Sequence, residues 1–215
     1  MEPEAKSRLL ESRGYRRLEA AWGSGFKRVC DVAISAVGLA ASLPLWPFVA
    51  AAIKLNSKGP VFYVQKRVGR SGQLFRLIKF RSMVKDAENG EPLWAEENDV
   101  RVTAVGRVLR RVHLDEIPQL WNILRGDMSL AGPRPERPEF VAELGGQIPF
   151  YELRHVIKPG LTGWAQVNYK YAASLESSRK KLEYDLYYIS RWSPGLDVKI
   201  FVKTIGKIFE KERVG

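Results

Sequence analysis

The sequence contains few of the side chains that build disulfide frameworks or zinc sites. Its 215 residues include one cysteine, Cys30, and two histidines, His113 and His155. A single cysteine excludes an intrachain disulfide framework, and two histidines so far apart argue against a zinc site. This composition fits a protein that faces the cytosol.

Other kinds of segment are also missing. The sequence has no glycine-rich phosphate loop of the Walker or Rossmann kind and no internal repeat. Residues 1–25 mix acidic and basic side chains, so they lack the uninterrupted apolar core of a signal peptide. We expect them to form a short surface helix or a loosely ordered N-terminal arm.

Acidic residues are fewer than basic ones. The chain has 24 Asp and Glu against 35 Lys and Arg, and its formal net charge is +11 at pH 7. This balance favours anionic partners, namely nucleic acid, acidic lipid or phosphorylated substrates. The length is sufficient to bury a real core, most simply as one domain with an appendage.

The longest apolar segment, residues 29–55, contains one charged residue, Asp31, before Lys54 near its end. It is long enough to cross a bilayer. Basic residues flank it on both sides: Lys27, Arg28, Lys54 and Lys58. A spanning helix usually carries its Lys and Arg excess on the cytoplasmic side only, so these flanks favour a hairpin that enters and leaves by one face.

Two prolines, Pro44 and Pro47, stand in the middle of this segment. They remove helix hydrogen bonds and should kink the helix sharply. The Ser42 hydroxyl can help to satisfy the backbone groups freed at the kink. We therefore favour a re-entrant membrane helix over residues 26–58; a spanning helix and a buried soluble helix are the alternatives.

From Gly59 the sequence has the character of a globular domain. Residues 60–64 and 74–80 have the pattern of short strands on either side of a polar turn, which predicts a small antiparallel sheet. Lys79 and Arg81 share one face if the second strand continues. An isolated pair of this kind is more often a solvated basic strand face than a site.

An adjacent pair of carboxylates, Asp115 and Glu116, follows a basic run that Thr103 is expected to cap as a helix. Pro118 indicates that the pair lies at a helix start, where the helix dipole favours anions. Carboxylates close to arginines suit attack on phosphorus or the binding of a divalent metal beside a phosphate. The alternative is an ordinary capping pair.

The remaining half of the chain predicts a rigid loop and several helices. Arg134 lies between two prolines, so it loses little entropy when it binds a phosphate or a carboxylate. Helical spacing covers residues 136–144, 175–189 and 196–209. The last of these has a lysine row, Lys199, Lys203, Lys207 and Lys211, which suits a helix lying on an anionic membrane surface.

Together these motifs resemble the bacterial sugar transferase family, the monotopic polyprenyl-phosphate phosphoglycosyl transferases that begin exopolysaccharide, O-antigen and glycoprotein glycan assembly. The resemblance runs from about residue 26 to the C-terminus. It rests on the kinked apolar segment and on the motifs GPVFY (59–63), KFRSM (79–83), LDEIPQLWN (114–122), GPRP (132–135) and KPGLTGWAQVN (158–168). Residues 136–138 and 171–176 look most like the branch associated with exosortase-linked exopolysaccharide clusters.

The resemblance implies transfer of a sugar-1-phosphate from a UDP-sugar to undecaprenyl phosphate, with release of UMP, as the first membrane step of exopolysaccharide or glycoconjugate synthesis. Asp115 would be the nucleophile that forms a covalent phosphosugar-aspartyl intermediate, and Glu116 would bind the required Mg²⁺. Implied substrate-binding residues are Lys79, Arg81, Arg134, Lys170 and Asp197. The protein would lie among inner-membrane lipids, at the cytoplasmic face of the bacterial inner membrane, without nucleic acid. The resemblance also allows a homodimer.

Two departures from the family pattern bear on the predicted kink and site residues. Leu43 precedes Pro44 where relatives commonly have Ser-Pro, so the membrane kink is assigned to Ser42, Pro44 and Pro47 together. Tyr169-Lys170 stands where smaller relatives often have Gly-Arg, so either Lys170 substitutes for that arginine or the donor contacts differ. The sugar itself is not encoded in any motif.

We therefore predict an α+β, mostly helical protein with a re-entrant membrane hairpin, a small antiparallel sheet and surface-lying amphipathic helices. Its predicted parts are an N-terminal arm (1–25), the membrane helix (26–58) and a cytoplasmic catalytic domain (59–215). Two other functions remain open: a basic membrane-surface binding protein, and a metal-dependent diphosphatase that hydrolyses the nucleotide sugar.

Overall fold

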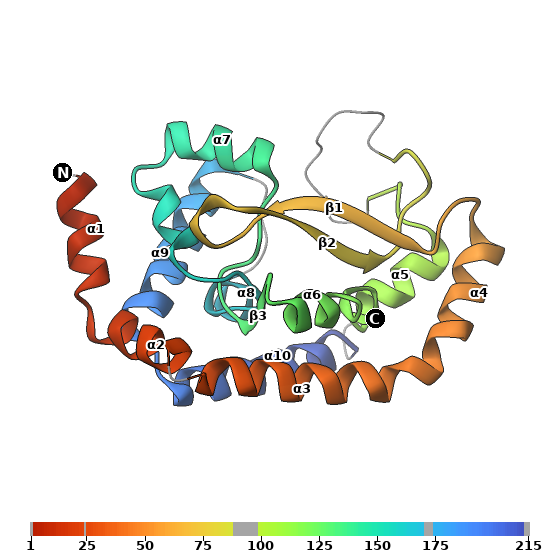
Figure 1. Ribbon diagram of the computed structural model, residues 1–215. Helices are drawn as coiled ribbons and strands as arrows, with labels where there is room; N and C mark the ends of the chain where they lie inside the picture. The colour runs from red at the N-terminus through yellow and green to blue at the C-terminus, as the bar shows by residue number, and fades with distance from the viewer. Residues whose placement is uncertain (1, 24, 88–98, 170–173, 213–215) are drawn as a thin grey trace.

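The computed structural model describes residues 2–23, 25–87, 99–169 and 174–212, and these are mostly helical (Figure 1). The α-helices are α1 (Glu2–Leu10), α2 (Arg13–Gly23), α3 (Phe26–Ser42), α4 (Trp46–Asn56), α5 (Ala104–Arg111), α6 (Gln119–Arg125), α7 (Pro138–Gln147), α8 (Trp164–Asn168), α9 (Leu175–Arg191) and α10 (Pro194–Glu212). The 3-10 helices are η1 (Leu43–Leu45), η2 (Arg70–Gly72), η3 (Leu114–Glu116) and η4 (Tyr151–Val156). The predicted mostly helical class is confirmed.

The strands form two small sheets. β1 (Phe62–Val68) and β2 (Leu74–Phe80) pair antiparallel, with Phe62 opposite Phe80 and Val68 opposite Leu74, which confirms the predicted hairpin. β3 (Ser129–Ala131) and β4 (Gly160–Thr162) pair in parallel and were not predicted. Three residues each are too short for a period-2 pattern to be recognised in the sequence.

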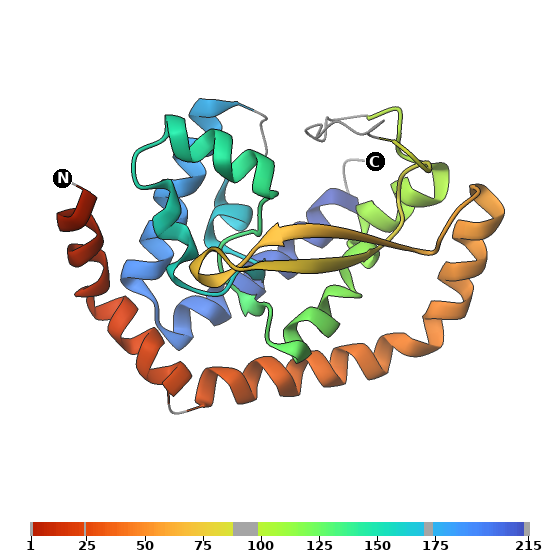
Figure 2. The ribbon, with the colours of Figure 1, turned by 45° about the horizontal axis from the view of Figure 1, so that its top comes forward.

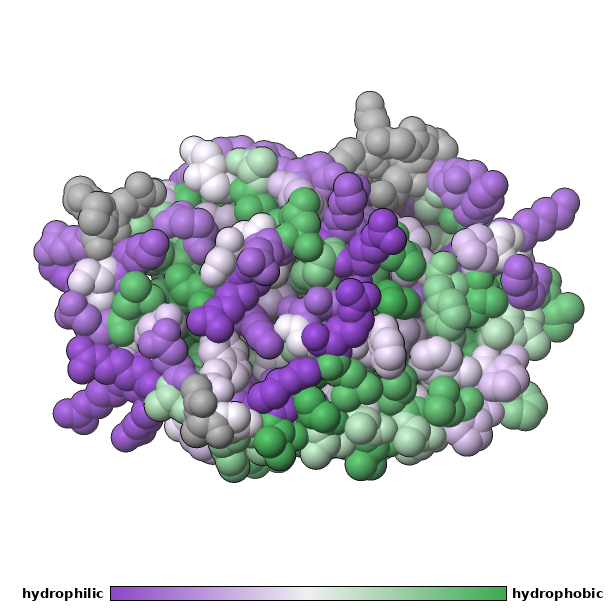
Figure 3. Space-filling view, in the orientation of Figure 1, coloured by the Kyte–Doolittle hydropathy of each residue, from purple (hydrophilic) through white to green (hydrophobic). Residues whose placement is uncertain are grey.

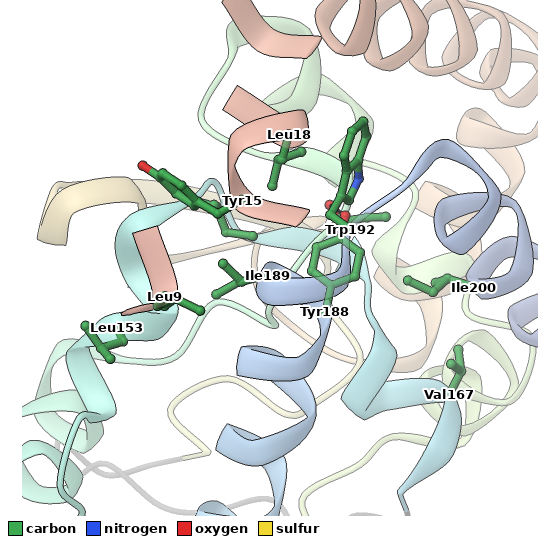
Figure 4. Close-up of a cluster of buried hydrophobic side chains, with 11 residues drawn as sticks. Leu9, Tyr15, Leu18, Leu153, Val167, Tyr188, Ile189, Trp192 and Ile200 are labelled. Carbon is green, nitrogen blue, oxygen red and sulfur yellow. Dashed lines mark hydrogen bonds between the residues drawn. The ribbon is translucent and has the colours of Figure 1, made fainter. Parts of the chain in front are cut away.

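The largest buried cluster joins both ends of the chain. Leu18 of α2, Tyr188 of α9, Trp192 directly after α9, and Ile200 of α10 lie together in it (Figure 4). Leu9 of α1 is 8% exposed and also belongs to this cluster. The described part of the N-terminal segment is therefore packed into the core rather than loose, whereas the division of the chain into three domains stays a prediction.

The apolar segment is helical and broken where the prolines predict it. α3 ends at Ser42, η1 follows with Pro44 in its first turn, and α4 starts with Pro47 in its first turn. Figure 2 shows the chain change direction between α3 and α4. The Ser42 hydroxyl donates to the Leu39 carbonyl at 2.8 Å, as expected of a residue at a kink.

α3 has the reverse of the polarity expected of a helix on a soluble protein. Its buried residues are polar or charged: Lys27, Asp31, Ser35 and Ser42. Its outward side is apolar, with Val29 66% and Val37 70% exposed. Among the described residues, the run from Phe26 to Asn56 is the one helical segment long and apolar enough to cross a membrane. Figure 3 shows hydrophobic residues gathered along the lower edge, over α3 and α4.

α10 contributes a second exposed apolar row along the same lower edge (Figure 1). Val198, Val202 and Ile205 are 60%, 64% and 56% exposed. The predicted arrangement of its lysines is wrong for the described side chains. Lys203 donates to the side-chain oxygen of Asn168, and Lys207 donates to the Gln166 carbonyl. These lysines bind α8 because its carbonyls and amides face them, so they do not form a free row on the membrane side.

Candidate active site

Three separate segments bring four charged side chains together. β2 carries Lys79, η3 carries Asp115 and Glu116, and the loop after β3 carries Arg134. One oxygen of Glu116, Oε1, accepts from Lys79 Nζ and from Arg134 Nη2, each at 2.9 Å. Glu116 thus joins two cations that are far from it in the sequence.

The local sequence explains how the two carboxylates are presented. The Thr103 side chain accepts from the Gly106 amide at 2.9 Å and caps α5, as predicted. His113 follows in the left-handed region (φ 56°) and turns the chain into η3, where Asp115 and Glu116 form the first turn. The carboxylate pair therefore stands at a helix start, although this helix is a short 3-10 turn ahead of α6.

A buried asparagine fixes the distance between the hairpin and the carboxylates. Asn122 of α6 is 0% exposed; its Oδ1 accepts from the Ile78 amide and its Nδ2 donates to the Arg76 carbonyl. These bonds replace strand partners on the free edge of β2 and hold α6 against it. Sequence reasoning did not assign this role to Asn122, because its partners are backbone groups of another element.

The pKa values of the two carboxylates shift in opposite directions. Burial would raise the pKa of Glu116, but Lys79 and Arg134 outweigh it and hold this pKa well below its usual range. Burial raises the pKa of Asp115, and Lys79 opposes that shift. Burial likewise lowers the pKa of Lys79, against the attraction of Glu116. Glu116 therefore acts as a fixed anion that holds the two cations.

Asp115 differs from Glu116 in its contacts. It is 6% exposed. Within the described part of the chain, its carboxylate has no hydrogen bond or ion pair. Burial raises its pKa, and the charges of three nearby cations, Lys79, Arg110 and Arg134, oppose that rise. None of the three donates a hydrogen bond to the Asp115 carboxylate. Its lone pairs are consequently free, next to cations able to receive an anionic substrate.

A narrow crevice of about 10 Å³ opens beside these side chains. Its lining is Arg67, Leu77, Lys79, Gln119, Arg134 and Pro135. This is about the space of one water molecule or one oxygen atom. Two buried donors of the lining, Arg67 Nε and Gln119 Nε2, have no hydrogen-bond partner among the described residues. Sequence reasoning missed both, although Gln119 lies within the LDEIPQLWN motif.

Other predicted site residues lie apart from this group. Arg81 is buried and donates to the Ser57 and Lys58 carbonyls, so it joins β2 to the C-terminal end of α4. Asp197 accepts from Lys27, Tyr188 and Trp192. Lys170 lies outside the described residues. Substrate binding by these residues stays a prediction.

The carboxylates fit a magnesium ion that is shared with a substrate. Among the described residues there is no group of three or more His, Cys, Asp or Glu that could hold a metal ion alone. Mg²⁺ commonly uses one or two carboxylates together with substrate phosphates and water. Glu116 has its Oε1 occupied by Lys79 and Arg134, which leaves Oε2 and the Asp115 oxygens as the available donors.

Comparisons with known proteins point to one family. The family model for "Bacterial sugar transferase" matches residues 22–211. The chain is 46% identical over 182 residues to the UDP-N-acetylgalactosamine-undecaprenyl-phosphate N-acetylgalactosaminephosphotransferase of Aeromonas hydrophila, covering 85% of this chain and 43% of that protein. It is 43% identical over 186 residues to the UDP-glucose:undecaprenyl-phosphate glucose-1-phosphate transferase of Escherichia coli K12, covering 85% and 40%.

A third relative is of similar length. The uncharacterized sugar transferase EpsL of Bacillus subtilis is 38% identical over 192 residues, which cover 87% of this chain and 89% of that protein. The chain thus spans well under half of the two longer relatives and nearly all of the shorter one. The exosortase-associated branch is not specifically indicated by any of these matches.

Proposed function

This chain belongs to the bacterial sugar transferase family, and from that we propose that it transfers a sugar-1-phosphate from a UDP-sugar to undecaprenyl phosphate and releases UMP. The names of the relatives support this reaction. The observation that carries the proposal is the pairing of a free carboxylate, Asp115, with an adjacent Glu116 that holds Lys79 and Arg134.

We further propose a two-step mechanism. An Asp115 oxygen attacks the sugar-bearing phosphorus, the bond from that phosphorus to the bridging oxygen breaks, and UMP leaves with that oxygen. A phosphate oxygen of the lipid then attacks the same phosphorus and frees the Asp115 carboxylate. Both steps balance without an oxidant or a further reactant. The free lone pairs of Asp115 suit this role, whereas the oxygen of Glu116 that binds two cations does not.

Lys79 and Arg134 would counter the charge of the diphosphate. An anionic nucleophile is repelled by a diphosphate until cations neutralise it, and the departing UMP needs the same neutralisation. Mg²⁺ bound by Glu116 would add charge neutralisation at the same place. Gln119 and Arg67 line the adjacent crevice with unpaired N–H donors, which suit an acceptor oxygen of the donor substrate.

We propose that the apolar segment is re-entrant and that the protein lies at the cytoplasmic face of the bacterial inner membrane. The exposed apolar sides of α3 and α10 and the break at Pro44 support this arrangement. The basic residues at the start of α3 do not support it, because Lys27 pairs with Asp197 inside the fold and Arg28 donates to two backbone carbonyls of α6. A hairpin would hold the active site at the height of the lipid phosphate. The predicted homodimer stays a prediction.

The membrane topology can be tested by cysteine labelling in cells. Arg17→Cys and Lys58→Cys, made separately in a Cys30→Ser background, place a thiol on either side of the apolar segment. If the segment is re-entrant, an impermeant maleimide applied from outside the inner membrane labels neither variant. A spanning helix exposes one of the two and would overturn this part of the proposal.

The reaction can be tested by intact-protein mass spectrometry. The protein is incubated with Mg²⁺ and a panel of UDP-sugars, without lipid acceptor. We expect a mass gain of one phosphosugar with the correct donor, absent in Asp115→Asn, and loss of that adduct when undecaprenyl phosphate is added. Lipid product without an adduct would favour direct transfer. Stoichiometric release of free sugar phosphate without lipid would indicate a diphosphatase.

A further inference from the structure

The backbone of the loop that carries Arg134 is held from several sides. Four consecutive carbonyls, those of residues 133–136, each accept a hydrogen bond from a different residue. The donors are the Gly160 amide (2.8 Å), Arg154 Nη2 (3.0 Å), Arg67 Nη1 (3.2 Å) and the Val68 amide (3.0 Å). They come from β4, η4 and β1, so three elements meet on one short loop.

The carbonyl of Arg134 itself is bound by another arginine. Arg154 is 5% exposed; its Nη1 donates to the Tyr151 hydroxyl at 2.6 Å while its Nη2 reaches the Arg134 carbonyl. The same guanidinium forms an ion pair of 2.8 Å with Asp185 of α9, which is 2% exposed. Arg154 therefore links α9, through η4, to the residue that binds Glu116.

Stability alone is a weak reason for such a pair. Burying an arginine and a carboxylate costs desolvation energy that their attraction often fails to recover. In proteins generally, well-packed apolar side chains of similar volume are often as stabilising as a buried ion pair or more so. The pair is better explained if it holds neighbouring groups in place, because the rigid planar guanidinium of arginine can bind several acceptors in one fixed arrangement.

Because Arg134 has a proline on either side, the orientation of its carbonyl decides the direction of its side chain. Pro133 and Pro135 have fixed φ angles, and Pro135 also restricts the conformation of the residue before it. What remains is the orientation of the Arg134 peptide, which sets the direction in which its side chain leaves the loop. The bond from Arg154 holds that orientation.

We propose that Arg154 and Asp185 form a positioning pair that sets the Arg134 guanidinium against Glu116 for the transfer reaction. The proposal rests on the function proposed above. Neither residue touches the substrate: both act through the Arg134 backbone. Lys181 of α9 and Glu136 of the loop are the other charged groups whose fields reach Asp185.

The test compares Arg154→Lys with Tyr151→Phe. Lysine keeps the charge opposite Asp185, but its three N–H groups share one nitrogen, which cannot occupy the positions of both Nη1 and Nη2 of Arg154. We expect kcat to fall by roughly 10- to 100-fold, as for small displacements of a substrate-orienting group, with KM for the UDP-sugar changed much less. Tyr151→Phe removes another bond of the same guanidinium and spares the Arg134 carbonyl, so kcat should stay near that of the wild type.

Amide hydrogen exchange gives a readout that does not depend on turnover. Residues 131–137 should exchange faster in Arg154→Lys and not in Tyr151→Phe. If Arg154→Lys fails to fold, Asp185→Asn, which leaves an amide oxygen opposite Arg154, should show the same losses in milder form. Unchanged kcat and exchange in a folded Arg154→Lys, or equal losses in Tyr151→Phe, would overturn the proposal. A wild type without transferase activity would overturn the proposed function, while the exchange result still decides the positional link.

Discussion

Lys27 and Asp197 lie 170 positions apart in the sequence, and their side chains form a buried ion pair with Nζ and Oδ2 2.6 Å apart. The other oxygen of Asp197 accepts from Tyr188 and Trp192, two aromatic residues of the main core. The pair joins the start of α3 to the start of α10. It therefore fixes α3, which has the exposed apolar face, to α10 and to the main core.

Removing Asp197 should cost stability. Asp197→Ala leaves the buried Lys27 with its longer contact to Asp31 Oδ1, at 3.7 Å. Breaking a buried pair costs about 3–5 kcal/mol, and we expect a loss of about 3 kcal/mol because Asp31 remains. Chemical denaturation in detergent measures the change, with the exposed Glu143→Ala as a control near zero. The affinity for UDP-sugar should be unchanged in folded Asp197→Asn. A large loss of affinity with little loss of stability would instead support the predicted substrate-binding role.

Neutralising each of the two carboxylates of the candidate active site should have a different effect on the stability of the fold. Glu116→Gln leaves Lys79 and Arg134 without their shared anion, so we expect a loss of about 2 kcal/mol of stability. Asp115→Asn removes a buried charge with no bonded partner, so its stability should be unchanged or slightly higher. Thermal unfolding of both variants decides this. If both variants are destabilised equally, the Asp115 carboxylate must form a stabilising hydrogen bond or ion pair in solution.

The exposed apolar faces should control membrane binding. Val37→Lys on α3 and Val202→Lys on α10 place a charge where we expect lipid, at a cost on the order of 2 kcal/mol, or roughly 30-fold in partitioning. Vesicle flotation measures the bound fraction. Val64→Lys is the matched control, because it makes the same change from valine to lysine at an exposed position on β1. Equal effects of all three substitutions would contradict a membrane-facing edge.

The stability of the fold should depend on the protonation of Asp185. Burial raises the pKa of Asp185 to about 6, against the attraction of Arg154, so the folded state binds this proton more tightly than the unfolded state does. This group therefore contributes stability below pH 4 that is lost as the pH rises through 6, on the order of 3 kcal/mol.

Asp185→Asn should remove that pH dependence. Denaturant titrations at pH 4, 5, 6 and 7 compare the slope of stability against pH in the variant and in the wild type. Asp185→Asn also changes the contacts of Arg154 at every pH, so only the slopes are compared. An identical slope in both proteins would show that Asp185 stays ionised throughout this range.

Much of the site was visible in the sequence, because its chemistry depends on contiguous motifs. The adjacent Asp115 and Glu116, and Arg134 between two prolines, stand out by their immediate neighbours. Gln119, Asn122 and Arg154 were not assigned, since their roles depend on partners from distant elements. The lysine row of α10 was misplaced for the same reason: periodicity predicts which residues share a face, but not what covers that face.

The sequence by itself determined the broken apolar segment, the hairpin and the motifs that carry the chemistry. Each depends on interactions within a few residues: missing N–H groups at prolines, period-2 alternation, and adjacent charges. Only the tertiary structure decided that α3 turns its polar side inward, that Asp197 pairs with Lys27, and that Lys79 and Arg134 meet on one oxygen of Glu116. Those contacts join residues far apart in the chain, and their geometry is set by how the elements pack.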